Sequence, residues 1–257
     1  MIKPPLAVLA CLGVLGTLWW FSSPVAANGN TAGTKSVNVD SLTTRFDAVT
    51  ISKVTVGDQE IQTGRSTAAS ELTPGAPFQA DEDWLKKMSI FIKNRTDKEI
   101  VCAEVELVFP DTGDGTEARP VTAYTISVGQ RPEWSRYVFD GTREELRQLD
   151  PRKPLDATRM KLRPLDPSKK PLSLPPGKTL EIRVADYIDP IQSLVEEHLP
   201  FQQITRVNIS RRVVYFQDGM RWNVGTYEIP DPNHPGYYTQ LAAGYFPGNA
   251  LQYPARE

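Results

Sequence analysis

The clearest alternation of apolar and polar residues lies in positions 203–228, on both sides of an Asp-Gly pair. Asp218-Gly219 suits a two-residue type I′ turn, because both positions of that turn need positive φ. With this loop Tyr215 faces Trp222 across the strands, a pairing that stabilises antiparallel sheets. The pattern therefore predicts one long β-hairpin with Trp222 on its buried face.

A second alternating unit lies in positions 84–109. Apolar residues recur at every second position from Met88 to Ile92, and again from Val101 to Phe109, with a polar turn at 94–97 between the two runs. This period of two predicts a pair of strands with one apolar face. Glu104 falls on the opposite side of the return strand, so we expect that side, which Cys102 shares, to meet solvent.

Further short runs predict additional strands and two helices. The strands are expected at 46–56, 121–128 and 178–185. One short helix is expected at 140–149. A second is expected to start at Asp189-Pro190, where aspartate suits the N-cap, proline suits the first helical position and Gln192 completes a capping box. The sequence thus predicts a mainly β chain of seven to nine antiparallel strands in a two-layer β-sandwich.

The unit from Met88 to Asn94 (Met-Ser-Ile-Phe-Ile-Lys-Asn), with its polar turn and the run from Ile100 to Phe109, resembles the central strands of immunoglobulin-like and fibronectin-type β-sandwiches of exported bacterial proteins. The chain lacks the Cys-Trp-Cys framework of antibody domains. The resemblance implies a binding or structural module and carries over no functional residue.

The first residues predict export. Lys3 precedes an almost wholly apolar run of 16 residues, 6–21, and small residues at 25–27 suit a cleavage site. This arrangement is typical of a secretory signal peptide, and the run is shorter than the roughly 20 residues of a membrane-spanning helix. We therefore expect a periplasmic or extracellular protein. An uncleaved segment would instead leave a membrane anchor.

Composition suggests how the rest of the chain is organised. Residues 28–45 are rich in small polar side chains and read as a flexible leader. The β domain is expected at 46–229, with an insertion near 150–176 that contains seven prolines. Residues 230–257 form an aromatic tail rich in proline and glycine. Removing residues 1–27 leaves one cysteine, so no intramolecular disulfide is expected and stability must come from the core.

Charge and motifs narrow the possible functions. The net charge is −2, and no basic stripe interleaved with aromatic residues predicts binding to nucleic acid. The two histidines, His198 and His234, accompany no Gly-x-Ser-x-Gly elbow and match no zinc spacing with Cys102. We predict no cofactor and a non-enzymatic protein, with a hydrolase as the least favoured alternative.

One acidic loop is a candidate metal site. Asp111, Asp114 and Glu117 could offer oxygen ligands to calcium, although their spacing departs from the Asp-x-Asp-x-Asp-Gly loop. The glycines between them equally suit a turn that needs positive φ.

The second candidate site is aromatic. Tyr237, Tyr238 and Tyr245 lie in the C-terminal part, where exposed rings could stack on sugars or could pin the tail to the sheet. The sequence thus favours an exported binding or structural module with an unknown protein or glycan partner. A carbohydrate-binding domain that uses these tyrosines is the alternative.

Overall fold

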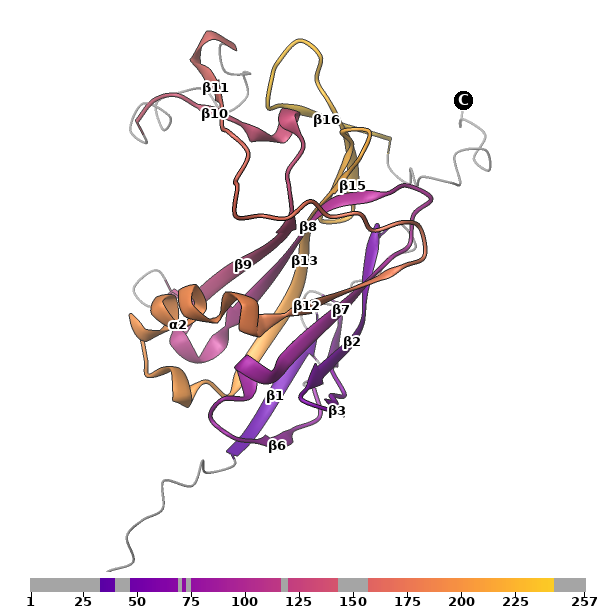
Figure 1. Cartoon of the computed structure of the whole chain (residues 1–257). Helices are drawn as coiled ribbons and strands as arrows, with labels where there is room; N and C mark the ends of the chain where they lie inside the picture. The colour runs from indigo at the N-terminus through magenta and orange to yellow at the C-terminus, as the bar shows by residue number, and fades with distance from the viewer. Residues whose placement is uncertain are drawn as a thin grey trace, which may run out of the picture. The chain divides into compact units, whose positions relative to one another are not determined.

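The computed structural model describes residues 33–39, 47–68, 71–72, 75–116, 120–142 and 157–242. Residue contacts divide the chain into Met1–Asn30 and Thr31–Glu257, and every described residue belongs to the second unit. Within it the chain is mainly β, as the sequence predicts, with three sheets and one α-helix among the described residues (Figure 1). The expected signal peptide lies outside the described residues.

The smaller of the two main sheets holds four strands in the order β12-β7-β2-β3. Its strands are β2 (Val49–Val56), β3 (Gln59–Glu60), β7 (Met88–Asn94) and β12 (Thr179–Arg183). Met88, Ile90 and Ile92 are at most 1% exposed, so the alternation of β7 buries the predicted face. Every pair in this sheet is antiparallel.

The larger sheet holds ten strands. They are β1 (Gly33–Val39), β4 (Gly64–Ala68), β5 (Glu71–Leu72), β6 (Phe78–Ala80), β8 (Ile100–Phe109), β9 (Thr122–Gly129), β13 (Arg206–Phe216), β14 (Arg221–Asn223), β15 (Thr226–Pro230) and β16 (Tyr238–Gln240). A separate pair joins β10 (Tyr137–Phe139) to β11 (Met160–Leu162).

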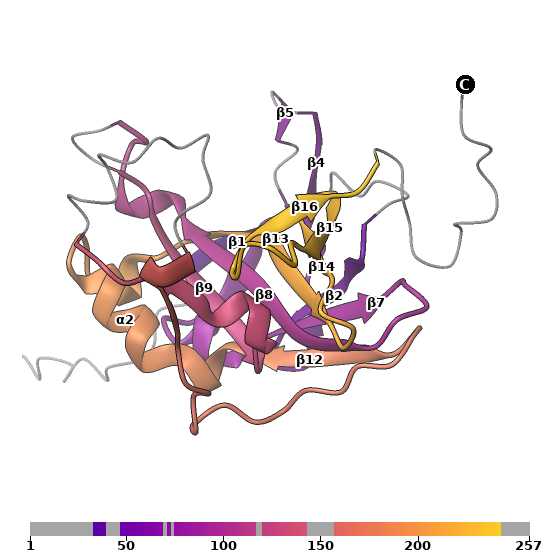
Figure 2. The same cartoon turned by 90° about the horizontal axis from the view of Figure 1, so that it is seen from above.

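Strand β13 is the centre of the larger sheet. It pairs with β8 along most of its length, while its other edge is shared between β1 at its start and β14 at its end. The β1–β13 and β1–β4 pairs are parallel, in contrast to the antiparallel pairing that the sequence suggests throughout. The four-stranded sheet lies against one face of this sheet (Figures 1 and 2).

A single apolar core joins the two sheets. Buried side chains of β2 and β7 belong to the same cluster as those of β8 and β13, among them Ile90, Leu107 and Ile209, all 0% exposed. Burying side chains of this size stabilises the fold by about 1.5–3 kcal/mol each. One buried ion pair also bridges the sheets: Arg211 Nη1 of β13 donates to Asp47 Oδ2 at 2.7 Å and to the Val49 carbonyl at 3.1 Å.

The predicted register of the hairpin is wrong by one residue. Trp222 pairs with Val214 rather than Tyr215, and Gly219 donates its amide to the Phe216 carbonyl at 3.0 Å. Of the two expected turn residues only Gly219 has positive φ, at 87°. The loop is therefore three residues long, with glycine closing it as a bulge.

The type I′ geometry occurs instead one turn later. Val224 (φ 40°) and Gly225 (φ 91°) link β14 to β15, so the chain continues as a meander into β16. The long hairpin predicted at 203–228 is thus three strands. The strands themselves were predicted correctly, but the position of the tight turn was not, and Trp222 therefore shares a face with Val214 instead of Tyr215.

The expectation that one side of β8 faces solvent is also wrong. Cys102 is 0% exposed and Glu104 is 5% exposed. Arg131 pairs with Glu104 on this side, and Leu174 forms a bridge with Ile100 at the start of the strand. The residues that pack against this side of β8 lie 27 to 74 positions further along the chain. The local pattern of β8 therefore does not predict that this side is buried.

The helix α2 (Ile188–Glu196) lies where the sequence places it, but its cap differs. Asp189 lies within the first turn and not at the N-cap, which is Tyr187, and no side chain caps the helix. Gln192 bonds Glu196 at 2.7 Å instead of closing a capping box. Among the described residues, no helix has the length and apolar character to cross a membrane.

The expected leader, insertion and tail all contain ordered elements. The leader contributes β1, the insertion contributes β11, and the tail contributes β16. Most of the helix expected at 140–149 lies outside the described residues. Short 3-10 turns complete the fold at Trp84–Lys87, Pro110–Thr112, Glu133–Arg136, Ala157–Arg159, Val184–Tyr187 and Phe201–Gln203.

Candidate functional site

A basic pocket forms where the chain leaves β9 and where it returns after β11. Its walls are the segments 130–138 and 163–169, and the cavity between them has a volume of about 150 Å³ and opens to solvent. Four basic side chains and one acidic side chain line it: Arg131, Arg136, Arg163, Lys169 and Asp166. Two polar and two apolar residues complete the lining. We call this site the basic pocket.

Hydrogen bonds to main-chain carbonyls hold the two walls together. Gln130 Nε2 donates to the carbonyls of Asp166 and Lys169 at 2.5 and 2.7 Å. Arg136 Nη1 donates to the Arg163 carbonyl at 2.5 Å, and the Arg163 amide donates back to the Arg136 carbonyl at 3.0 Å. The pocket is thus built from two segments that are crosslinked at both ends.

The local sequence explains both walls. Pro132 (φ −60°) starts the 3-10 turn Glu133–Arg136, and Ser135 donates its hydroxyl to the Pro132 carbonyl at 2.8 Å. In the other wall, Asp166 Oδ1 accepts the Ser168 amide at 3.0 Å, which is an Asx turn. Proline and aspartate therefore fix the backbone on which the basic side chains stand.

The larger sheet anchors Arg131 firmly. Its Nε and Nη2 donate to Oε1 of buried Glu104 at 2.7 and 2.5 Å, and its guanidinium lies 5.8 Å from the centroid of the Tyr215 ring. Burial raises the pKa of Tyr215, which keeps the phenol neutral at physiological pH. Residues at the end of β9, on β8 and on β13 thus fix one cationic wall of the pocket.

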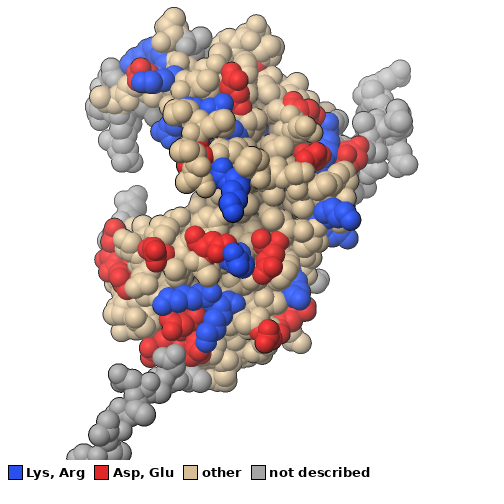
Figure 3. Space-filling model, viewed as in Figure 1, with Lys and Arg blue, Asp and Glu red and all other residues tan. Residues whose placement is uncertain are grey.

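Asp166 offsets only part of the positive charge. Hydrogen bonds from the Ser168 hydroxyl and amide lower the pKa of Asp166, and nearby Lys169 lowers it further. The carboxylate is ionised at neutral pH, yet it points one oxygen at Ser168. Figure 3 shows this face hollowed between the parts that carry β10–β11 and α2, with Lys and Arg bordering the hollow on the β10–β11 side.

Cys102 lies buried next to this site. Its Sγ is 3.8 Å from Ser127 Oγ, and burial raises the pKa of the thiol to about 11. A thiol with that pKa is protonated at neutral pH and is a poor nucleophile. Its environment is that of a small core residue.

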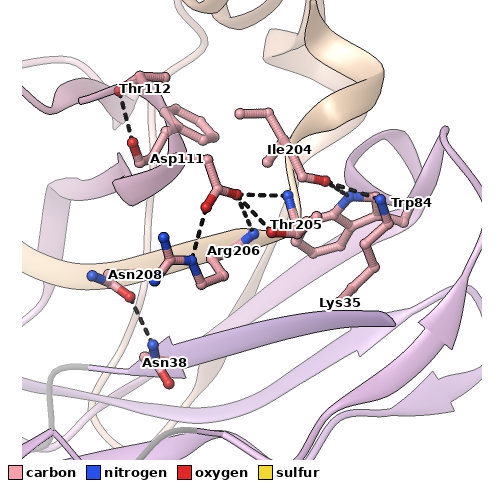
Figure 4. A network of polar contacts seen from close by, with 10 residues as sticks. Lys35, Asn38, Trp84, Asp111, Thr112, Ile204, Thr205, Arg206 and Asn208 are labelled. Atoms are coloured by element: carbon pink, nitrogen blue, oxygen red, sulfur yellow. Dashed lines mark hydrogen bonds and ion pairs between the residues drawn. The ribbon is translucent and has the colours of Figure 1, made fainter. Parts of the chain in front are cut away.

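Asp111, the first of the predicted metal ligands, serves a structural contact (Figure 4). Oδ2 accepts the Thr205 amide at 2.7 Å and hydroxyl at 2.9 Å, and Oδ1 accepts Arg206 Nε at 2.8 Å. Partial burial raises the pKa of Asp111, but these hydrogen bonds outweigh burial and hold the pKa below its usual value. The carboxylate therefore fastens the start of β13 to the end of β8.

The other two predicted metal ligands are not brought together with Asp111 by the described part of the structure. Asp114 is exposed and accepts the Thr116 amide at 3.0 Å, while Glu117 lies outside the described residues. In the part of the chain that the structure describes, no three His, Cys, Asp or Glu side chains form a group able to hold a metal ion.

Two of the three predicted sugar-binding tyrosines are half-buried, and Tyr245 lies outside the described residues. One face of the Tyr238 ring is covered by Arg221, whose guanidinium carbon lies 3.8 Å from the ring centroid, and burial raises the Tyr238 pKa to about 12. The carbonyl of Tyr237 accepts Trp134 Nε1 at 2.9 Å. Trp134 belongs to the segment 130–138 but does not line the cavity, so this contact joins Tyr237 to that segment and not to the pocket itself.

The two histidines occupy separate settings. His234 Nδ1 lies 2.7 Å from Asp231 Oδ2 within the loop between β15 and β16. His198 is exposed just after α2. The described contacts of His234 are local and stabilise a turn, because Asp231 also accepts the Asn233 amide at 2.9 Å.

A second hollow lies at the tip of the β13–β14 loop. It is lined by Lys98, Glu99, Gln217 and Asp218. Lys98 and Asp218 pair with each other there, so their charges are already compensated. The basic pocket is therefore the stronger candidate.

Only a faint signal for the basic pocket is present in the sequence. Its basic residues occur as isolated Arg and Lys in the loop after β9 and in the proline-rich insertion, 27 to 38 positions apart. Comparisons with protein-family models, curated proteins and solved structures found no match to this chain. The interpretation of the pocket therefore rests on its own geometry and chemistry.

Proposed function

We propose that this chain is an exported, non-enzymatic binding module, a two-layer β-sandwich of the immunoglobulin type, whose ligand occupies the basic pocket. Lys3 and the apolar residues 6–21 support export. The core shared by the ten-stranded and four-stranded sheets supports the sandwich architecture. Binding sites on such modules are commonly formed by loops that a rigid scaffold positions.

The observation that carries this proposal is the construction of the basic pocket. Its Arg131 is held by Glu104 and Tyr215 on the sheet, and its two walls are joined by hydrogen bonds to carbonyl groups. The cavity of about 150 Å³ is smaller than most small-molecule sites, roughly 300–1,000 Å³, so it suits a small ligand or one group of a larger ligand. A preformed concave site with fixed charged groups favours recognition of a ligand over a purely structural role.

Binding of a carbohydrate is the second candidate. Trp134 and Tyr137 stand edge to face at 6.1 Å beside the pocket, and Trp134 bonds the Tyr237 carbonyl. Half-buried aromatic rings next to charged and amide donors are a combination that suits sugar rings. In this alternative Tyr237 acts with the pocket, while the covered ring of Tyr238 acts as support.

A glycan and metabolite array probed with the full chain tests the proposal. We expect at least one ligand class to bind, and Tyr237→Ala or the double substitution Arg163→Gln with Lys169→Gln to abolish its signal. Loss only in Tyr237→Ala favours the carbohydrate alternative. A panel without any binder, or binding that none of these substitutions affects, contradicts a ligand site here.

Export has a separate test. In a bacterial host, we expect the protein in the envelope or secreted fraction to begin at Asn28, the residue after the proposed signal peptide. N-terminal sequencing of the purified protein measures this. A chain found only in the cytoplasm with residues 1–27 intact would contradict export.

A further inference from the structure

The positive charge of the basic pocket is a local feature. The whole chain carries a net charge of −2, yet four of the five ionisable side chains that line the pocket are basic. They come from two segments brought together by folding. An accumulation of like charges in one cavity costs stability unless a counter-charge fills it.

These groups leave the pocket with a net positive charge, because its four cations face only the carboxylates of Glu104 and Asp166. Glu104 neutralises Arg131, and Asp166 directs one carboxylate oxygen to Ser168. Among the residues that the structure describes, no carboxylate forms an ion pair with Arg136, Arg163 or Lys169. Arg163 and Lys169 stand in the second wall, opposite Arg136 in the first.

Arg136 adds a hydrogen-bond donor without a partner. Its Nη1 bonds the Arg163 carbonyl, but its Nε is buried and has no acceptor in the described part of the chain. A buried donor without an acceptor costs about 1–3 kcal/mol. Such groups are rare in folded proteins, and each one calls for an explanation, of which a bound ion is one.

We propose that the basic pocket binds a phosphate or sulfate group, so that the ligand of the proposed binding module is a phosphorylated or sulfated molecule. Two guanidinium groups and one ammonium group present more donors than the two oxygens of a carboxylate can accept. A tetrahedral oxyanion offers three or four oxygens, and guanidinium forks bind such groups in bidentate geometry. This inference rests on the proposed function and specifies its ligand.

The remaining lining indicates how the rest of the ligand is held. Val138 and Pro164 are the apolar members of the lining, and Ser135 supplies a hydroxyl. The cavity of about 150 Å³ is larger than a bare oxyanion, and its open side leaves room for the group that carries the phosphate or sulfate. Contacts with Val138 and Pro164 would then favour an ester over the free ion.

Calorimetric titration of the full chain tests the inference. The probes are inorganic sulfate, inorganic phosphate, glucose 6-phosphate with glucose as its neutral control, and vesicles of phosphatidylglycerol or phosphatidylcholine. We expect saturable binding of the oxyanion probes at low salt, about 20 mM, and weaker binding at 200 mM because the charges are then screened. Vesicle binding without binding of the soluble probes would identify a lipid headgroup as the source of the same phosphate chemistry.

Matched double substitutions locate the binding. Arg163→Gln with Lys169→Gln should weaken binding at least tenfold, because it removes two charge-assisted contacts. Lys161→Gln with Lys170→Gln removes the same charge from neighbouring exposed positions outside the pocket and should change affinity less than twofold. Thermal melts of both variants establish that each is folded.

Three results would overturn the inference. Equal weakening by the two double substitutions would show nonspecific attraction, and binding of no oxyanion probe would remove the site. Glucose binding as tight as glucose 6-phosphate binding, and unaffected by Arg163→Gln with Lys169→Gln, would also remove it. That last result would leave the proposed binding module intact, whereas absence of any ligand on the wider array would contradict the module itself.

Discussion

At the scale of single residues, Val224 has the most strained backbone conformation among the described non-glycine residues. It is the only one of these residues with positive φ, and its side chain is 63% exposed. A β-branched residue is poorly suited to the left-handed region, because its Cβ approaches the following carbonyl. The tight turn that the sequence suggests for Asp218-Gly219 is thus made by a less suitable residue pair.

Val224→Asn should stabilise the protein by about 0.5–1 kcal/mol, because asparagine tolerates positive φ and the exposed valine contributes little burial. Urea unfolding measures the change. Val224→Ala serves as the control, since it removes the branch but keeps the strain, and should gain less. A loss of stability in the asparagine variant would show that the side chain of Val224 makes a stabilising contact that outweighs the backbone strain.

Cys102 should be inert in the folded protein. Burial raises its pKa to about 11, so at pH 8 roughly one thiol in a thousand is ionised, and the side chain is also inaccessible. We expect modification by a thiol reagent only after addition of denaturant, at one thiol per chain once residues 1–27 are removed. Rapid labelling of the native protein would contradict the burial.

At the scale of elements, the sequence predicts strands well and their surroundings poorly. The alternation of Met88 to Ile92 identifies both β7 and its buried face. The same reasoning fails for Glu104, because its cover is Arg131 from a loop after the next strand, and no local pattern records that pairing. The register of β13 and β14 likewise depended on a three-residue loop that Asp-Gly alone does not distinguish from a two-residue one.

Trp222 is buried in either register. Val214, Tyr215 and Phe216 are each at most 3% exposed, so both faces of β13 are covered at this end. Trp222→Ala should therefore cost about 3–5 kcal/mol. A loss under about 1 kcal/mol in a chemical denaturation experiment would contradict the burial of the ring.

The contact between Asp111 and the start of β13 should respond to pH. The pKa of Asp111 is lowered in the folded state, so its contribution is fully present above the unfolded pKa, about 3.9, and is lost as pH falls through the folded value. Asp111→Asn lacks this contribution. We expect the stability difference between wild type and variant to be constant above about pH 5 and to shrink below about pH 4.

Urea unfolding at a series of pH values measures that difference. Asp58→Asn, at an exposed position, is the control and should differ little from wild type at any pH. A difference that stays constant down to pH 2 would show that the lost hydrogen-bond geometry matters and that the charge does not.

At the scale of the whole molecule, stability should be highest in the centre of the larger sheet. Strand β13 is paired on both edges, whereas β10 and β11 pair only with each other and are half-exposed. We expect the amides of β13 to exchange hydrogen most slowly and those of β10 and β11 much faster. Similar rates in these strands would mean that the walls of the basic pocket unfold only with the core.

The basic pocket could not be predicted from the sequence, because only the tertiary structure brings its residues together. Arg136 and Arg163 have no shared pattern in the sequence, and only the pairing of β10 with β11 brings them together. The net charge of −2 does not reveal such a pocket, since a net charge averages over the whole chain. Folding concentrates four basic side chains where the average conceals them.

The parallel pairing of β1 with β13 has a consequence for how the protein is made. Asn38 bonds Asn208, 170 positions further on, so the matching edge of β1 stays open until the last third of the chain has been synthesised. At about 5–20 residues per second, that interval lasts on the order of ten to thirty seconds. A chain released before β13 is complete would keep β1 with one unpaired edge. Such an edge can pair with other chains, so we expect incomplete chains to aggregate or to be bound by chaperones and degraded by proteases.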